Sequence, residues 1–208
     1  MRTDYLNPEL YNRLYSVMTY ENVLALRISL ETGLRIDDVL SLRGDQISGR
    51  TVKGTAEKTG KPFKKVISAE LAKRVRRLGR TGYIFPHRTK PGKHRTRQAV
   101  WANMKKAADV MGVQLNAAPH SARKTYAVEV FRDRGLEAAQ KELQHDRMST
   151  TMLYAFSNMI LQGNCDNSTK NALNSGNCDN SSQNALNSVN IEEFAELIAK
   201  KVVKFLHK

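Results

Sequence analysis

The chain has few cysteines, no long apolar run and a shortage of acidic residues. Only two of the 208 residues are cysteines, Cys165 and Cys178, and no other cysteine or histidine lies near either one in the sequence, which argues against a zinc site. No apolar run approaches the roughly 20 residues that a membrane-spanning helix needs. The first residues, Met1 to Tyr5, lack the apolar stretch of a secretory signal. These absences predict a cytoplasmic protein that keeps its cysteines as thiols and has no membrane partner.

The shortage of acidic residues is concentrated in one stretch. The chain has 34 Lys and Arg against 20 Asp and Glu, a net charge of +14. From Leu71 to Ala108 there is no acidic residue, and the basic residues there are Lys73, Arg74, Arg76, Arg77, Arg80, Arg88, Lys90, Lys93, Arg95, Arg97, Lys105 and Lys106. A charge run is often only a solvated face, but one this long without counter-charges favours a polyanionic partner, and we expect double-stranded DNA.

Apolar spacing and capping residues predict mostly helices. Asn7 and Pro8 mark a first helix start, with apolar residues at helical spacing as far as Met18. Further helices are expected at 22–31, 37–42, 68–78, 96–111, 120–134, 136–144 and 149–156. Between residues 46 and 67, branched residues alternate with glycines, which is typical of short antiparallel strands. The predicted fold class is therefore α+β, mainly α, with a small antiparallel sheet.

The last 45 residues differ in character from the rest. Two near copies, NCDNSTKNALNS and NCDNSSQNALNS, follow each other and are too polar to bury a core. After them, an apolar stripe from Ile191 to Leu206 predicts an amphipathic helix. We therefore expect a catalytic domain at 1–163, an Asn/Ser-rich linker at 164–189 and a C-terminal helix at 190–208.

Six side chains in a fixed order suggest the chemistry. They are Arg35, Lys58, His120, Arg123, His145 and Tyr154. Two arginines can hold both non-bridging oxygens of a phosphodiester, because each guanidinium presents a planar fork of donors. A histidine can accept the proton of a tyrosine nucleophile, and a lysine can protonate the leaving oxygen. This set needs no cofactor, metal ion or hydrolytic water.

Each of these residues has an ordinary structural explanation when it is taken alone. Arg35 could be a surface residue at a helix start, and His120 and Arg123 could share a solvated helix face. Tyr154 could be a half-buried core residue. For the lysine, three neighbours in the same predicted hairpin remain alternatives: Lys61, Lys64 and Lys65. The order and spacing of the whole set favour a catalytic site.

The stretches ETGLRIDDVLSL, PHSAR and LQHDRMSTTMLY, together with the order of the six residues, resemble the tyrosine recombinase (phage integrase) family. The resemblance runs from about Asn7 to Ser157, and Gln144 replaces a glycine that is usual in the family. It implies a tyrosine-recombinase-like catalytic domain in which Arg35 and Arg123 bind the scissile phosphate. By the same resemblance His120 is the general base, His145 a further phosphate donor, Lys58 the general acid and Tyr154 the nucleophile. Asp38 matches an acidic residue that braces the family's site.

The resemblance also implies an assembly and leaves alternatives. It implies a homo-tetramer on paired DNA sites, with accessory DNA-bending proteins as further candidate partners, and a cytoplasmic, nucleoid-associated location. Only 34 residues precede Arg35, so the chain is either a compact member or a catalytic-domain fragment of an integrase. A type IB topoisomerase-like nicking-closing enzyme and a catalytically silent DNA-binding regulator remain the alternatives to a site-specific recombinase.

Overall fold

Six helices and three short strands make up the part of the chain that the structure describes. In this computed structural model that part is residues 6–79, 82–112 and 116–143. The elements run in the order α1 (Pro8–Tyr15), α2 (Tyr20–Thr32), α3 (Ile36–Leu40), a 3₁₀ turn (Gly44–Gln46), β1 (Ile47–Ser48), β2 (Thr51–Thr55), β3 (Pro62–Val66), α4 (Ala69–Arg76), α5 (Arg97–Val110) and α6 (Pro119–Leu143).

Capping side chains set three of the helix starts. Asn7 Oδ1 accepts the backbone N–H of Leu10 at 2.8 Å, and Ser68 and Thr96 cap α4 and α5 in the same way. These starts were expected from the sequence. The end of α1 was predicted wrongly, because the helix stops at Tyr15 rather than near residue 18.

The chain turns after α1 so that a second helix can begin. Thr19, which precedes α2, donates its backbone N–H and its hydroxyl to Asn103 Oδ1 on α5 at 3.0 and 3.1 Å. Met18 is still buried, so its apolar side chain joins the core without being helical. The long-range contact to Asn103 therefore overrides the apolar spacing.

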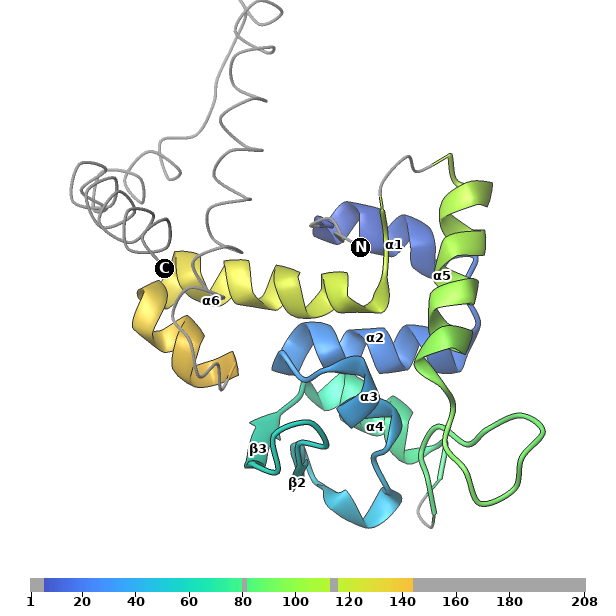
Figure 1. The fold of residues 1–208 in the computed structure, drawn as a ribbon, viewed down its shortest axis with the longest axis horizontal. Helices are drawn as coiled ribbons and strands as arrows, with labels where there is room; N and C mark the ends of the chain where they lie inside the picture. The colour runs from blue at the N-terminus through green and yellow to red at the C-terminus, as the bar shows by residue number, and fades with distance from the viewer. Residues whose placement is uncertain (1–5, 80–81, 113–115, 144–208) are drawn as a thin grey trace, which may run out of the picture. The chain divides into compact units, whose positions relative to one another are not determined.

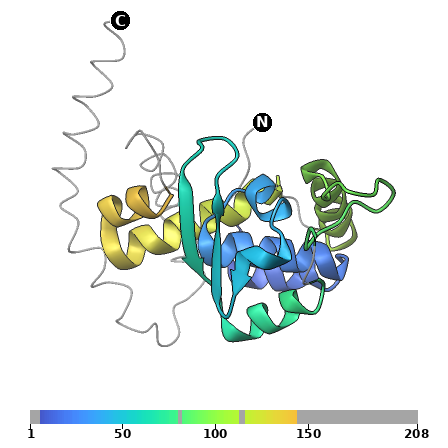
Figure 2. The ribbon, with the colours of Figure 1, turned by 90° about the horizontal axis from the view of Figure 1, so that it is seen from below.

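The strands form the expected antiparallel sheet, in the order β1-β2-β3. In the β2–β3 hairpin Thr51 pairs with Val66 and Thr55 with Pro62. Val52 and Phe63 are buried, while Lys53 and Lys64 are exposed, so one face of the hairpin packs on the helices. Figure 2 shows the hairpin standing beside the end of α6.

Helix α2 lies at the centre of the helical layer. Leu24, Ala25, Leu26 and Ile28 are fully buried along it, so the helix is apolar on more than one face. It packs against α6, α3 and α4, and Figure 1 shows α2 and α6 side by side. Helix α6 is interrupted at Gly135 (φ 82°), where the sequence predicted a helix end.

Several expected features lie outside the described residues. They are His145, Tyr154, the helix at 149–156, the linker at 164–189 and the helix at 190–208. The predicted domain boundaries therefore stay predictions. Within the described ranges, no helix is long and apolar enough to cross a membrane.

Candidate active site

The turn that carries Arg35 depends on a glycine. Helix α2 ends at Gly33, which has φ +70°, and Arg35 follows two residues later as the N-cap residue of α3. A Cβ atom on Gly33 would lie 2.4 Å from Cδ1 of Tyr126 on α6. Glycine is therefore required both for the left-handed backbone and for the close approach of α6. The turn holds Arg35 half-buried between α2 and α3.

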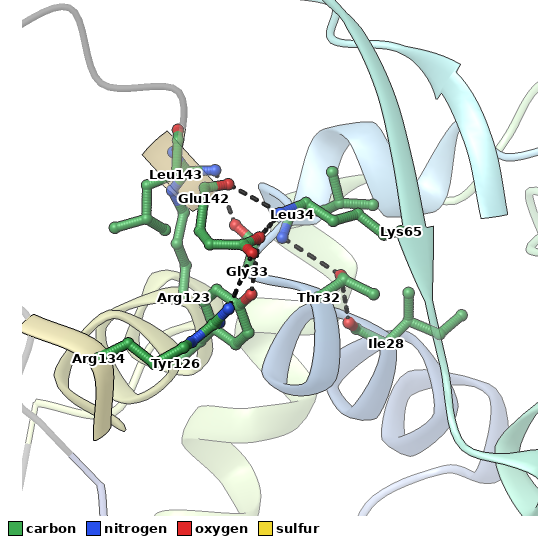
Figure 3. Close-up of polar contacts among 10 residues, drawn as sticks. All are labelled: Ile28, Thr32, Gly33, Leu34, Lys65, Arg123, Tyr126, Arg134, Glu142 and Leu143. Atoms are coloured by element: carbon green, nitrogen blue, oxygen red, sulfur yellow. Dashed lines mark hydrogen bonds and ion pairs between the residues drawn. The ribbon is translucent and has the colours of Figure 1, made fainter. Parts of the chain in front are cut away.

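Arg123 joins this turn to the end of α6. It is only 4% exposed. Its Nη1 donates to the carbonyl oxygen of Gly33 and its Nη2 to that of Leu143, both at 2.7 Å (Figure 3). The two carbonyl oxygens account for two of the five N–H donors of the guanidinium. A buried charge needs such partners, so the arginine orders two chain segments while lying in the site.

Lys58 lies in the turn of the β2–β3 hairpin, and Asp38 ties that turn to α3. Asp38 Oδ1 accepts the backbone N–H of Glu57, the residue before Lys58, at 2.8 Å. Asp38 is buried, and its Oδ2 has no hydrogen-bond partner among the described residues. Lys58 itself is exposed. The bracing role expected for Asp38 therefore corresponds to a contact with the backbone of the lysine turn.

His120 lies in the first turn of α6, next to the arginines. Loss of water around the ring and the charges of Arg123, Lys124, Arg35 and Arg97 lower its pKa from 6.5 to about 4. The residue is exposed overall, so the cations are the firmer reason for the direction of this shift. At neutral pH the imidazole is therefore uncharged and can accept a proton.

A cluster around Glu142 was not predicted from the sequence. The Glu142 carboxylate receives the ammonium of Lys65, the hydroxyl of Tyr126 at 3.2 Å and Nη1 of Arg134 at 3.3 Å (Figure 3). The hydrogen bond from Lys65 lowers the pKa of Glu142. Burial and the carboxylate raise the pKa of Tyr126 to about 12, so its phenol stays protonated.

Local sequence held little sign of this cluster. Tyr126 follows Arg123 by three positions and so shares its helix face, which is a weak signal. Lys65 was considered only as an alternative to Lys58. No local pattern links Lys65 to Glu142, which lies 77 positions further along the chain.

The structure brings several of the predicted residues together. Arg35, Asp38 and Arg123 line one cavity of about 10 Å³, close to the size of one water molecule. Lys65 and Glu142 line it too, whereas Lys58 does not. His120 lies close enough to Arg35 and Arg123 to feel their charges.

Two further observations concern the surroundings of the site. A larger cavity of about 240 Å³, between α1 and α2, contains none of the predicted site residues. Among residues 6–79, 82–112 and 116–143, no group of three or more His, Cys, Asp or Glu side chains could hold a metal ion.

Comparison with known proteins places the chain in one family. Residues 4–159, about three quarters of the chain, match the phage integrase family. The tyrosine recombinase XerD of Lacticaseibacillus casei is 29% identical over 141 residues, which cover 59% of this chain and 46% of that protein. The chain spans about half the length of the curated relatives it matches.

Solved structures show the same fold. The catalytic domain of bacteriophage HP1 integrase superposes with a TM-score of 0.59 at 21% identity, covering 74% of this chain and 88% of that one. The XerH site-specific recombinase, in a post-cleavage complex with its palindromic difH substrate, superposes with a TM-score of 0.58 at 19% identity, covering 72% and 48%. The expected fold class, mainly helical with a small antiparallel sheet, is confirmed.

Proposed function

Because the chain belongs to the phage integrase family, we propose that it is a site-specific DNA recombinase that cleaves and rejoins DNA through a 3′-phosphotyrosyl intermediate. The observation that carries the proposal is the placement of two arginines, Arg35 and Arg123, around one cavity with His120 beside them. These side chains come from segments about 90 residues apart. Their convergence supports a site for one anionic group rather than three unrelated surface residues.

The arginines supply the phosphate site. Arg123 is held by two backbone carbonyls, so its guanidinium is ordered before a substrate arrives. Arg35 follows the Gly33 turn that accepts one of those hydrogen bonds. Preorganised donors of this kind stabilise the charge that develops on phosphate oxygens during nucleophilic attack. His145, whose structure is not described, is proposed as a further donor to the same phosphate.

The proton transfers complete the reaction. The Tyr154 oxygen attacks phosphorus, its proton passes to His120, and the bond from phosphorus to the 5′ oxygen breaks. Lys58 gives a proton to that 5′ oxygen, and the reverse sequence rejoins the strand. A bound phosphate would offset the cations around His120 and raise its pKa above the value of about 4 in the free protein, which favours proton transfer in the complex.

Double-stranded DNA is the proposed substrate. The net charge of +14 and the run of twelve basic residues between Leu71 and Ala108 support phosphate-backbone binding. XerH, which shares the fold, was solved bound to its difH substrate. We further propose a homo-tetramer on paired sites. Since the chain spans about half of its curated relatives, this assembly and the activity of the whole protein belong to the proposal.

A nicking-closing enzyme of the type IB topoisomerase kind is the second candidate, because it would use the same residues without a second duplex. The two outcomes differ in their products: a recombinase joins strands from two labelled duplexes, whereas a nicking-closing enzyme only relaxes supercoils. A catalytically silent regulator is less favoured, because the sequence retains all six proposed site residues.

The test is trapping of a covalent adduct. The protein is incubated with a pool of nicked duplexes with randomised arms, in which cleavage releases a short strand that diffuses away. Denaturing gels should show a 3′-linked DNA–protein adduct, and sequencing of the trapped DNA should reveal the preferred site. Mass spectrometry should map the linkage to Tyr154.

Tyr154→Phe is the matched control, because it removes only the nucleophilic hydroxyl. It should abolish the adduct while mobility-shift assays show unchanged DNA binding. An adduct that survives in Tyr154→Phe, or that maps to another residue, would falsify the mechanism.

A further inference from the structure

Glu142 places a negative charge beside the proposed phosphate site. It lines the same small cavity as Arg35 and Arg123. A carboxylate and a phosphate present similar oxygen pairs to a guanidinium, so both bind arginine by the same fork of donors. An unrestrained carboxylate at this position would therefore compete with the substrate for the arginines.

Three donors from three places in the fold hold this carboxylate. Lys65 lies on β3 and Tyr126 in the first part of α6. Arg134 directly precedes the break in α6 at Gly135. Figure 3 shows them gathered on Glu142 while Arg123 points to the carbonyls of Gly33 and Leu143. Glu142 and Arg123 therefore interact with different groups in these contacts.

Lys65 is the most important of the three donors. Its side chain is only 14% exposed, whereas that of Arg134 is 53% exposed, and an exposed ion pair contributes little. Tyr126 is neutral and cannot offset the charge. The ammonium of Lys65 also donates to the backbone carbonyl of Glu142 at 2.8 Å, which fixes the end of α6 as well as its side chain.

We propose that Lys65 is a positioning residue that keeps the Glu142 carboxylate away from the phosphate-binding arginines. It acts through Glu142 and does not itself touch the scissile phosphate. This role rests on the proposed function, because it assumes that Arg35 and Arg123 bind a phosphodiester. It also distinguishes Lys65 from Lys58, which does not line the cavity and lies in the hairpin turn.

Removing Lys65 should release the competitor. In Lys65→Met the Glu142 carboxylate keeps Tyr126 and the exposed Arg134 but loses its buried cation, so that it can turn toward Arg123 or Arg35. Adduct formation in a single turnover should therefore slow roughly 10-fold or more. DNA affinity should match that of the control Lys53→Met, which removes an exposed lysine from β2 of the same sheet.

Removing the carboxylate as well should reverse the defect. The double variant Lys65→Met/Glu142→Gln also lacks the lysine on β3, but it has no carboxylate at position 142 to compete with the phosphate. Its rate of adduct formation should return to within about threefold of wild type. A purely structural role for Lys65 predicts the opposite, because the double variant loses further contacts and should be at least as slow as the single one.

A second substrate separates Lys65 from the general acid. A duplex with sulfur in place of the scissile 5′ oxygen has a leaving group that needs no protonation. It should rescue Lys58→Met but not Lys65→Met.

Lys65→Gln provides a second version of the change, because its amide can still donate to the Glu142 carbonyl while the charge is lost. It should be slow and be rescued by Glu142→Gln in the same way.

The outcomes are distinguishable. If wild type forms no adduct with the nicked pool, the proposed function fails. If wild type reacts, the inference is overturned by normal rates in folded Lys65→Met or Lys65→Gln, or by a double variant that stays slow. Thermal unfolding of each variant shows whether it is folded.

Discussion

At the scale of single residues, the two arginines differ in how deeply they are built into the fold. Arg123 is buried and donates to two backbone carbonyls. Arg35 is half-buried and precedes α3 as its N-cap residue. Both are proposed to bind phosphate, but only Arg123 also connects α2 to the end of α6. Substitutions should therefore separate catalysis from stability.

Arg123→Lys should impair both properties, because one ammonium cannot reproduce the planar fork that bridges the carbonyls of Gly33 and Leu143. Leaving a buried acceptor unpaired should lower the free energy of unfolding by about 1–3 kcal/mol. Arg35→Ala should change stability much less. Both should slow adduct formation by roughly 100-fold or more. Urea unfolding and single-turnover cleavage measure the two effects.

The matched control is Arg74→Lys, at a partly exposed residue of α4 that pairs with Glu70. It should change neither quantity appreciably. Equal losses of binding and cleavage in Arg35→Ala would show instead that this arginine is an ordinary DNA contact.

His120 should give a pH dependence of known sign. Its pKa of about 4 in the folded chain lies below the unfolded value of 6.5. Between these values the unfolded chain binds the proton more, so the contribution of His120 to stability rises with pH from about 4 to 6.5 and is complete above 6.5. His120→Gln should remove this part of the pH dependence.

Two measurements check the His120 prediction. The difference in thermal midpoint between wild type and His120→Gln should change between pH 4 and 6.5 and stay constant above. An NMR titration of the imidazole should have its midpoint near 4 without DNA. A midpoint above 6 would show that the neighbouring cations do not act on the ring.

At the scale of elements, the site depends on how α2, α6 and the β2–β3 hairpin meet. Gly33 lets the ring of Tyr126 approach the end of α2. Arg123 and Lys65 each bind a carbonyl near the end of α6, where the helix leaves its last carbonyls without internal partners. Two cations from different parts of the chain thus cap the same helix end. The hairpin is held by Asp38 at its turn and by Lys65 on β3.

Gly33→Ala tests this packing. The new Cβ would lie 2.4 Å from the Tyr126 ring on a backbone with φ +70°, so both a clash and backbone strain arise. The free energy of unfolding should fall by about 2–4 kcal/mol, and cleavage should fall with it because Arg35 follows the turn. Chemical denaturation and adduct formation provide the readouts.

Gly49→Ala is the control, since Gly49 also has positive φ but nothing lies within 4 Å of its new Cβ. It should show only the backbone cost, about 1–2 kcal/mol. If the two variants lose the same free energy of unfolding, the clash with Tyr126 does not contribute to the destabilisation.

At the scale of the whole molecule, we expect the last 45 residues to contribute to the proposed tetramer. Sequence predicts an amphipathic helix at 190–208 on a polar linker of 26 residues, and a flexible chain of that length spans roughly 25–30 Å. An apolar stripe needs a surface to cover it. We expect the helix to dock on an adjacent protomer when DNA is bound, with docking on its own domain as the alternative.

Deletion of residues 164–208 distinguishes these arrangements. If the helix couples neighbouring protomers, the shortened protein should bind DNA and form the adduct on a single half-site, but assemble paired sites poorly in mobility-shift assays. Normal recombination of paired sites would rule out docking of the helix on an adjacent protomer. A shortened protein that no longer folds would favour docking of the helix on its own domain.

Sequence alone determined the helix starts at Asn7, Ser68 and Thr96, the break at Gly135 and the family, because capping, glycine conformation and short motifs act over a few residues. Only the tertiary structure decided that α1 ends at Tyr15, that Arg123 is anchored by Gly33 and Leu143, and that Lys65 pairs with Glu142. These contacts join segments 20 to 90 positions apart. Local spacing carries no record of such pairs, since burial, close packing and the need to satisfy buried charges choose them only when the helices and the hairpin come together.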